Sequence, residues 1–206
     1  MFLYLEIFGA LIGILYIILE YRASVWLWPV GIVMPFVYIY IYLKAGIYAD
    51  MGINIYYLLA AIYGWIVWLR ASKRHADKQS TEPTAKESSG ITRTSSYEWL
   101  WCAAVLVILQ VLLSYILIKY TQSTVPYCDS FTTALSIVGM WMLAHKRLEH
   151  WIVWVIVDAV STALYIDKGL YPTAALYALY TIIATCGHFR WRRLMINDNK
   201  EVLTSS

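Results

Sequence analysis

Seven apolar runs follow one another along the chain, separated by polar segments. They cover about residues 3–19, 25–43, 47–69, 98–118, 130–144, 149–166 and 171–189. A helix needs roughly 20 mostly apolar residues to cross about 30 Å of hydrocarbon, and all the runs approach that length. The fifth run is the shortest. The pattern predicts an all-α membrane protein with seven transmembrane helices.

The longest polar segment, HADKQSTEPTAKESSGITRTSS at 75–96, follows the third run. It has few apolar groups to bury, so we expect it to be a mobile tether. The helices are then arranged as three, one and three. The expected parts are a first three-helix bundle at 1–70, a cytoplasmic loop at 71–97, a linking transmembrane helix at 98–119, a second three-helix bundle at 120–193 and a cytoplasmic tail at 194–206.

Positive charge is distributed unevenly between alternate loops. Of the 16 Lys and Arg residues, all but Lys44, Lys119 and Lys168 fall on one side of the predicted membrane. Cytoplasmic loops carry the excess of Lys and Arg, so the N-terminus is expected outside and the C-terminus in the cytoplasm. The first run lacks a basic leading segment and a small-residue cleavage site, which favours a retained helix over a signal peptide.

The composition agrees with this class of protein. Hydrophobic residues make up 61% of the chain, charged residues only 14%, and the mean hydropathy is +0.59. Soluble domains carry roughly 25% charged residues. The three cysteines form no C-x-x-C pair, which disfavours a disulfide framework or a zinc site. No cofactor and no metal are expected.

The chain also repeats itself. When residues 10–70 are moved forward by 123 positions onto 133–193, twelve positions are identical. Several are of rare types: Trp28 matches Trp151, Gly64 matches Gly187 and Trp68 matches Trp191. The extra helix between the copies gives both triplets the same direction across the membrane. Parallel repeats of this kind occur in transporters, whose substrate sites lie between the repeats near mid-membrane.

Polar and aromatic residues recur on single helical faces. In the third run, Asp50, Asn54 and Tyr57 share a face with the small residues Ala61 and Gly64, because they are spaced by three and four. Small residues let helices approach closely. The same face ends in Trp68, which, like its counterpart Trp191, is interpreted as part of an aromatic belt at the membrane interface.

Asp158 stands well inside the sixth run, on a face with Trp151, Trp154 and Tyr165. A carboxylate inside a membrane faces the bundle interior or water, and it marks either a binding site or a hydrogen-bond anchor between helices. Aromatic faces attract cations and stack on flat rings. We therefore expect a wet, aromatic chamber between the two triplets that suits a cationic aromatic ring.

These residues resemble the PnuC family of vitamin transporters over nearly the whole chain. The resemblance rests on YADMGINIYYLLAAIYGWIVW at 48–68, RLEHWIVWVIVDAVSTALYIDKGLY at 147–171 and ALYALY at 175–180. It implies a fold like that of the sugar-carrying SWEET proteins, with two three-helix bundles joined by one helix. It also implies a homotrimer in a bacterial cell membrane, and facilitated diffusion of an unphosphorylated vitamin that a cytosolic kinase then traps.

The branches of this family carry nicotinamide riboside, thiamine or riboflavin. A ribose calls for several buried amides, whereas the runs contain only Asn54 and Gln110, and Met140 stands where an amide would be expected. The aromatic second run also resembles the thiamine branch, PnuT. Thiamine is therefore the expected substrate, with nicotinamide riboside as the alternative.

The other classes of function find less support. A seven-helix receptor or retinal protein would share this topology, but the gapless repeat disfavours it and no lysine lies inside a run to bind retinal. No HExxH or GxSxG motif indicates a membrane enzyme. Proton coupling through Asp158 or Glu149 ranks below simple facilitation. The predicted substrate-binding residues are Trp28, Tyr42, Asn54, Tyr57, Gln110, Trp141, Trp151, Trp154, Asp158, Tyr165, Tyr177 and Tyr180.

Overall fold

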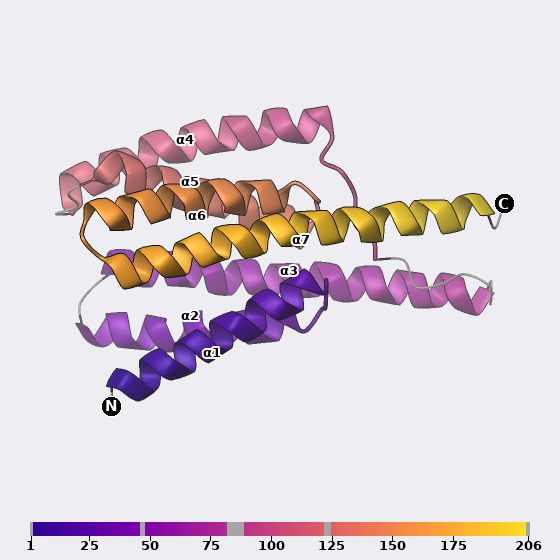
Figure 1. Ribbon diagram of the computed structural model, residues 1–206, viewed down its shortest axis with the longest axis horizontal. Helices are drawn as coiled ribbons and strands as arrows, with labels where there is room; N and C mark the ends of the chain where they lie inside the picture. The colour runs from indigo at the N-terminus through magenta and orange to yellow at the C-terminus, as the bar shows by residue number, and fades with distance from the viewer. Residues whose placement is uncertain (1, 46–47, 82–88, 122–124, 205–206) are drawn as a thin grey trace. The chain divides into compact units, whose positions relative to one another are not determined.

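The computed structural model describes residues 2–45, 48–81, 89–121 and 125–204, with side chains described for 12–44, 51–72, 89–121, 125–198 and 200. Seven α-helices occur in these residues, one for each apolar run (Figure 1). The all-α prediction is confirmed. The helices are α1 Phe2–Tyr21, α2 Leu27–Ala45, α3 Tyr48–Thr81, α4 Ser96–Tyr120, α5 Pro126–Ala144, α6 His150–Asp167 and α7 Tyr171–Thr204.

Within the described residues, four helices contain stretches long and apolar enough to cross a membrane. These stretches are Leu27–Lys44, Met51–Ser72, Ser96–Tyr120 and His150–Asp167. A shorter apolar stretch, Ile12–Tyr21, lies in α1. Length and composition alone thus agree with a membrane protein.

The chain divides into two compact units, Met1–Gly90 and Ile91–Ser206. In the first unit α1 packs on α2 and α2 packs on α3. In the second unit α4 packs on α5, α5 on α6 and α6 on α7. Helix α4, expected as a link between two bundles, therefore packs as a part of the second unit.

Two helices are longer than the sequence pattern indicated. Helix α3 continues to Thr81 through the first part of the predicted loop, and α7 continues to Thr204 through most of the predicted tail. The reason is that both polar segments lack Gly and Pro and contain good helix formers. Helix α3 ends two residues before Pro83, which cannot follow a helical residue without strain.

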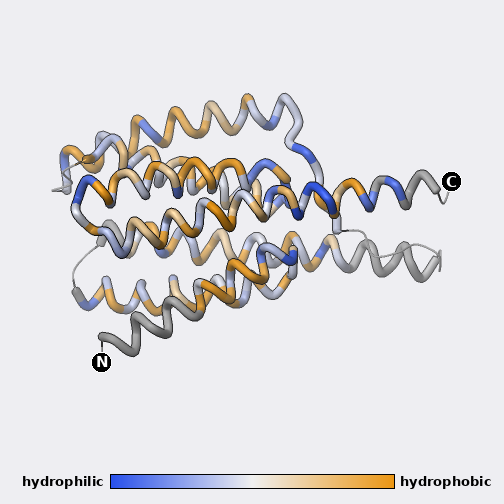
Figure 2. The backbone as a smooth tube through the Cα atoms, in the orientation of Figure 1, coloured by the Kyte–Doolittle hydropathy of each residue, from blue (hydrophilic) through white to orange (hydrophobic). Residues whose placement is uncertain are grey.

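Figure 2 shows α7 turning from mostly hydrophobic to largely hydrophilic past its middle. Residues 82–88 of the predicted loop lie outside the described residues.

One contact recurs in both units and supports the internal repeat. In the first unit, a Cβ added at Gly64 of α3 would lie 2.2 Å from Cη2 of Trp28 in α2. In the second, a Cβ added at Gly187 of α7 would lie 2.7 Å from Cη2 of Trp151 in α6. In each pair the glycine leaves room for the indole ring of the neighbouring helix.

A second tryptophan completes each contact. Trp28 meets Trp68 edge-on with ring centroids 5.6 Å apart, and Trp151 meets Trp191 edge-on at 5.9 Å. Trp68 and Trp191 are 1% and 0% exposed. The interpretation of these two residues as an interfacial belt is therefore wrong, because their rings lie inside the helix pairs.

Substituting Gly64 or Gly187 by Ala is expected to destabilise the protein by about 1–3 kcal/mol, because the new methyl group would overlap a buried indole ring. Denaturant titration of the purified protein in detergent micelles measures the free energy of unfolding. Gly52→Ala is the matched control, because Gly52 is also in α3 and a Cβ there meets nothing within 4 Å.

The control should be neutral or slightly stabilising, since Ala favours a helix over Gly by about 1 kcal/mol. Equal effects of Gly52→Ala and Gly64→Ala would contradict the close contact with Trp28.

Candidate substrate site

Three tyrosines and an aspartate come together where α6 and α7 pack against each other. Tyr165 of α6 stacks on Tyr177 of α7 with ring centroids 5.2 Å apart and an interplanar angle of 23°. Tyr177 meets Tyr180 edge-on at 5.9 Å. Asp158 stands seven residues before Tyr165 on the same face of α6, and it interacts electrostatically with Tyr180. Four predicted site residues from two helices thus form one cluster.

Asp158 is 7% exposed, so its carboxylate is buried in the second unit. Its backbone carbonyl accepts a hydrogen bond from Oγ1 of Thr162 at 2.7 Å, one helical turn further on. Tyr165, Tyr177 and Tyr180 are half-buried. The arrangement combines a buried acidic side chain with a group of half-buried aromatic rings on two neighbouring helices.

The two remaining aromatic residues of α6 pack in different directions. Trp151 faces α7, where it contacts Gly187, and the imidazole ring of His150 lies 4.7 Å from it. Trp154 faces α5, because a Cβ added at Gly139 would lie 3.6 Å from Cε2 of its indole. Trp151 is 2% exposed and Trp154 is half-buried, so Trp154 is the more accessible of the two.

The first unit holds the other predicted residues on α2 and α3. Trp28 is fully buried against Gly64, as described above. Tyr42 stacks on Tyr38 with ring centroids 5.7 Å apart, and Tyr57 lies 5.6 Å from Tyr56. Asn54 is half-buried. Asp50, which the sequence placed on the same face, has a side chain outside the described residues. The chamber between the two triplets stays a prediction.

An exchange of large and small residues distinguishes the two repeats. In the first unit, a Cβ added at Gly31 of α2 would lie 2.8 Å from Cε2 of Tyr16 in α1. The positions 123 residues later are Gly139 of α5 and Trp154 of α6, so the aromatic ring moves to the other helix of the pair. Sequence reasoning missed Tyr16. Comparing the non-identical pairs of the repeat, rather than the identical ones, would have found it.

Gln110 and Trp141 occupy different surroundings from the tyrosine cluster. The Gln110 amide nitrogen lies 3.2 Å from Ser114 Oγ, 3.0 Å from Ser130 Oγ and 3.2 Å from the Tyr127 carbonyl. Ser114 and Ser130 also share a hydrogen bond of 2.7 Å between their hydroxyls. The Gln110 amide therefore joins α4 to α5.

Trp141 of α5 packs beside the apolar core of the second unit, and its ring lies 4.4 Å from that of His145. The core itself consists of buried residues from α4, α5 and α6, namely Cys102, Leu135, Val138, Met142, Val153 and Val157. Trp154 packs on this core as well. The indoles of α5 and α6 are thus both held against one apolar cluster.

Comparisons with known proteins give one consistent result. A model of the family described as nicotinamide mononucleotide transporter matches residues 3–193. The nicotinamide riboside transporter PnuC of Escherichia coli strain K12 is 24% identical over 96% of this chain and 87% of its own length. The riboflavin/roseoflavin transporter RibM of Streptomyces davaonensis is 24% identical over 96% of this chain and 89% of its own length.

A solved structure has the same fold. The crystal structure of the vitamin B3 transporter PnuC matches with a TM-score of 0.66 and 20% sequence identity. The match covers 92% of this chain and 80% of that one. The likeness extends over nearly the whole chain, so it includes both units.

Replacing Gln110 by Leu is expected to destabilise the protein by about 1 kcal/mol, because Ser114 and Ser130 keep their mutual hydrogen bond. Gln110→Glu should cost about 2 kcal/mol or more, since a carboxylate would lose the donor and face the Tyr127 carbonyl. Denaturant titration in micelles measures both values. A loss of vitamin affinity in Gln110→Leu with unchanged stability would instead place Gln110 in the binding site, as the sequence predicted.

Proposed function

The chain belongs to the PnuC family of vitamin transporters, and from this we propose that it carries an unphosphorylated vitamin across the membrane by facilitated diffusion. The family model covers 191 positions, residues 3 to 193, and the relatives compared above are named as transporters. The chain is accordingly a transporter and not an enzyme. A cytosolic kinase that phosphorylates the vitamin would keep it inside the cell and supply the driving force.

The site in this proposal includes the cluster on α6 and α7. The observation that carries it is Asp158, a buried acidic side chain on α6 that interacts electrostatically with Tyr180, while Tyr165 on the same helix stacks on Tyr177 of α7. A charge is costly inside a membrane and is retained there mostly for function. Aromatic faces add attraction for a positive ring. Trp154 from the same helix provides a further flat surface for stacking.

Nicotinamide riboside is the substrate that we propose first. The E. coli relative is named as its transporter, and no relative reported above is named for thiamine. This reverses the order expected from the sequence, where the scarcity of buried amides favoured thiamine. Both molecules carry a cationic aromatic ring, so the carboxylate and the tyrosines suit either. Riboflavin, which is uncharged, is the third candidate because of the RibM relative.

Three further features belong to the proposal. The family resemblance implies a homotrimeric assembly, and the internal repeat with its aromatic faces predicts a binding chamber between the two triplets. The uneven distribution of Lys and Arg predicts that the N-terminus lies outside and the C-terminus in the cytoplasm. The residues predicted in the first unit, among them Asn54 and Tyr57, would also belong to this chamber. Pro35 of the first repeat aligns with Asp158, so only the second repeat has a carboxylate at this position.

Asp158→Asn is expected to weaken binding of nicotinamide riboside and thiamine about tenfold, which corresponds to roughly 1.4 kcal/mol of lost charge attraction. Riboflavin binding should change little, because that ring is uncharged. Calorimetry on the purified protein measures the three dissociation constants. Asp167→Asn is the matched control, since Asp167 is an exposed carboxylate at the end of the same helix.

Equal losses for the charged and uncharged vitamins would show that Asp158 acts through the fold and not through its charge. Unchanged binding of every vitamin would remove Asp158 from the site.

Liposomes containing the protein are expected to equilibrate radiolabelled nicotinamide riboside with or without a pH or sodium gradient, since facilitated diffusion needs neither. The internal and external concentrations should become equal, and protein-free liposomes provide the control. Accumulation above the external concentration in the presence of a gradient would contradict the passive mechanism and favour coupling.

A further inference from the structure

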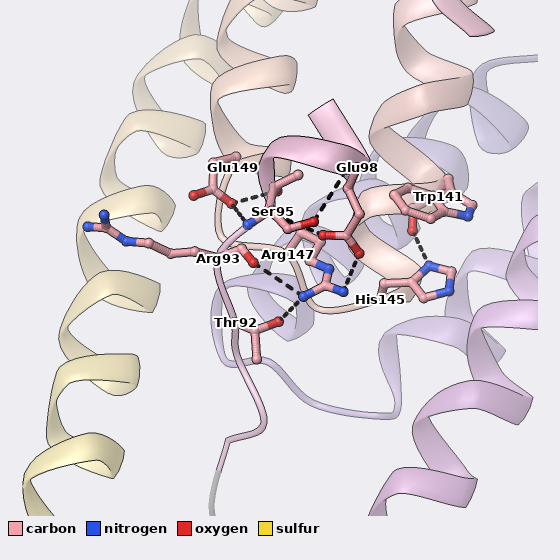
Figure 3. A network of polar contacts seen from close by, with 9 residues as sticks. Thr92, Arg93, Ser95, Glu98, Trp141, His145, Arg147 and Glu149 are labelled. Carbon is pink, nitrogen blue, oxygen red and sulfur yellow. Dashed lines mark hydrogen bonds and ion pairs between the residues drawn. The ribbon is translucent and has the colours of Figure 1, made fainter. Parts of the chain in front are cut away.

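The segment just before α4 lies along the turn between α5 and α6, although the two are far apart in the sequence (Figure 3). Thr92 and Arg147 form a parallel β-bridge. The Thr92 N–H donates to the Lys146 carbonyl at 3.1 Å, and the Leu148 N–H donates to the Thr92 carbonyl at 2.9 Å. Ile91 is buried beside this bridge. This end of the predicted loop is therefore not a plain tether.

Arg147 extends the contact from the turn to the start of α4. Its guanidinium donates to Oγ1 of Thr92 at 2.6 Å and to the Arg93 carbonyl at 3.3 Å, and it pairs with the Glu98 carboxylate. Glu98 also accepts a hydrogen bond from the Ser95 N–H at 2.8 Å. Ser95 and Glu98 form a capping box, so Arg147 contacts the group that starts the helix.

Glu149 joins the same segment to the start of α6. Its Oε2 accepts hydrogen bonds from the N–H of Thr94 at 2.8 Å and from the Thr94 hydroxyl at 2.7 Å. Ser, Thr, Asp or Asn at an N-cap accepts a hydrogen bond from its own helix. Glu149 stands at the N-cap of α6 and makes no such bond. Its carboxylate is directed to Thr94 instead.

The position of this contact matters because α6 carries the candidate site. Trp151 and Trp154 lie in the first two turns after Glu149, and Asp158 lies one turn further. Charge-assisted hydrogen bonds to one end of a helix restrict the movement of that helix along its own axis. A shift of one residue along the axis is about 1.5 Å, and a displacement of that size is enough to disrupt binding geometry.

We propose that residues 91–98 and 146–149 form a latch that fixes the axial position of α6. Arg147 and Glu149 are then positioning residues, acting on substrate through Trp154 and Asp158. This inference rests on the proposed function for its effect on binding, while the holding of α6 is a separate and measurable property. Alternatively, the same hydrogen bonds contribute only to the stability of the fold and have no effect on binding.

The test uses three variants of the full-length protein. Arg147→Ala removes the guanidinium, Arg147→Lys keeps the charge but cannot reach three acceptors at once, and Thr94→Val removes one hydroxyl without changing the shape. Arg93→Gln is the matched control. It removes a positive charge from the same segment, while the Arg93 carbonyl that contacts Arg147 remains.

Two quantities are measured for each variant. The first is the dissociation constant for nicotinamide riboside and thiamine, determined on the folded fraction. It should rise about tenfold in Arg147→Ala and about threefold in Arg147→Lys and Thr94→Val. The second is the amide hydrogen exchange of residues 151–155, which should become faster in all three variants. Exchange in residues 174–184 of α7 should not change, and Arg93→Gln should match the original chain in both quantities.

Unchanged exchange in residues 151–155 would overturn the latch. A lower unfolding temperature with an unchanged dissociation constant would also overturn it, because the bonds would then serve stability alone. If the unaltered protein binds none of nicotinamide riboside, thiamine and riboflavin, the proposed function fails, and hydrogen exchange still decides whether the latch holds α6.

Discussion

The close contact between an indole ring and a glycine is the interaction on which the helix pairs of this protein depend. Inside a membrane, lipid tails are as apolar as the side chains, so helices associate through close packing and hydrogen bonds. Trp28 with Gly64, and Trp151 with Gly187, provide such packing once in each unit. The edge-on partners Trp68 and Trp191 bury the rings further. Because both repeats retain the same three residues, α2 with α3 and α6 with α7 form equivalent pairs.

The sequence was sufficient to predict the helices and the repeat, because both leave a periodic signal. The apolar runs located all seven helices, and the offset of 123 residues paired the tryptophans and glycines that the structure brings together. The ends of α3 and α7 could not be predicted in this way. Their last turns are mostly polar, so they have no apolar run that would indicate a helix.

Side-chain roles were harder to predict than positions. Asp158 and Tyr165 were expected on one helical face, and Tyr177 and Tyr180 were among the predicted site residues, but no spacing indicated that α6 and α7 bring Tyr165 and Tyr177 together. The hydrogen bonds by which Gln110 joins α4 to α5 were not expected, because an amide in a membrane helix can bind a ligand or a neighbouring serine equally well. Likewise, no spacing rule connects Thr94 with Glu149, which are 55 residues apart. Contacts of this kind depend on how the chain folds back on itself.

Helix α7 runs without a break from Tyr171 to Thr204, well beyond the length that a bilayer requires. At 1.5 Å per residue its 34 residues measure about 50 Å. If the helix tilted as a rigid rod by about 10° around its midpoint, each end would move by about 4 Å. A displacement at Tyr177 or Tyr180, which lie nearer the midpoint of α7 than its ends do, would then be larger at the C-terminal end of the helix.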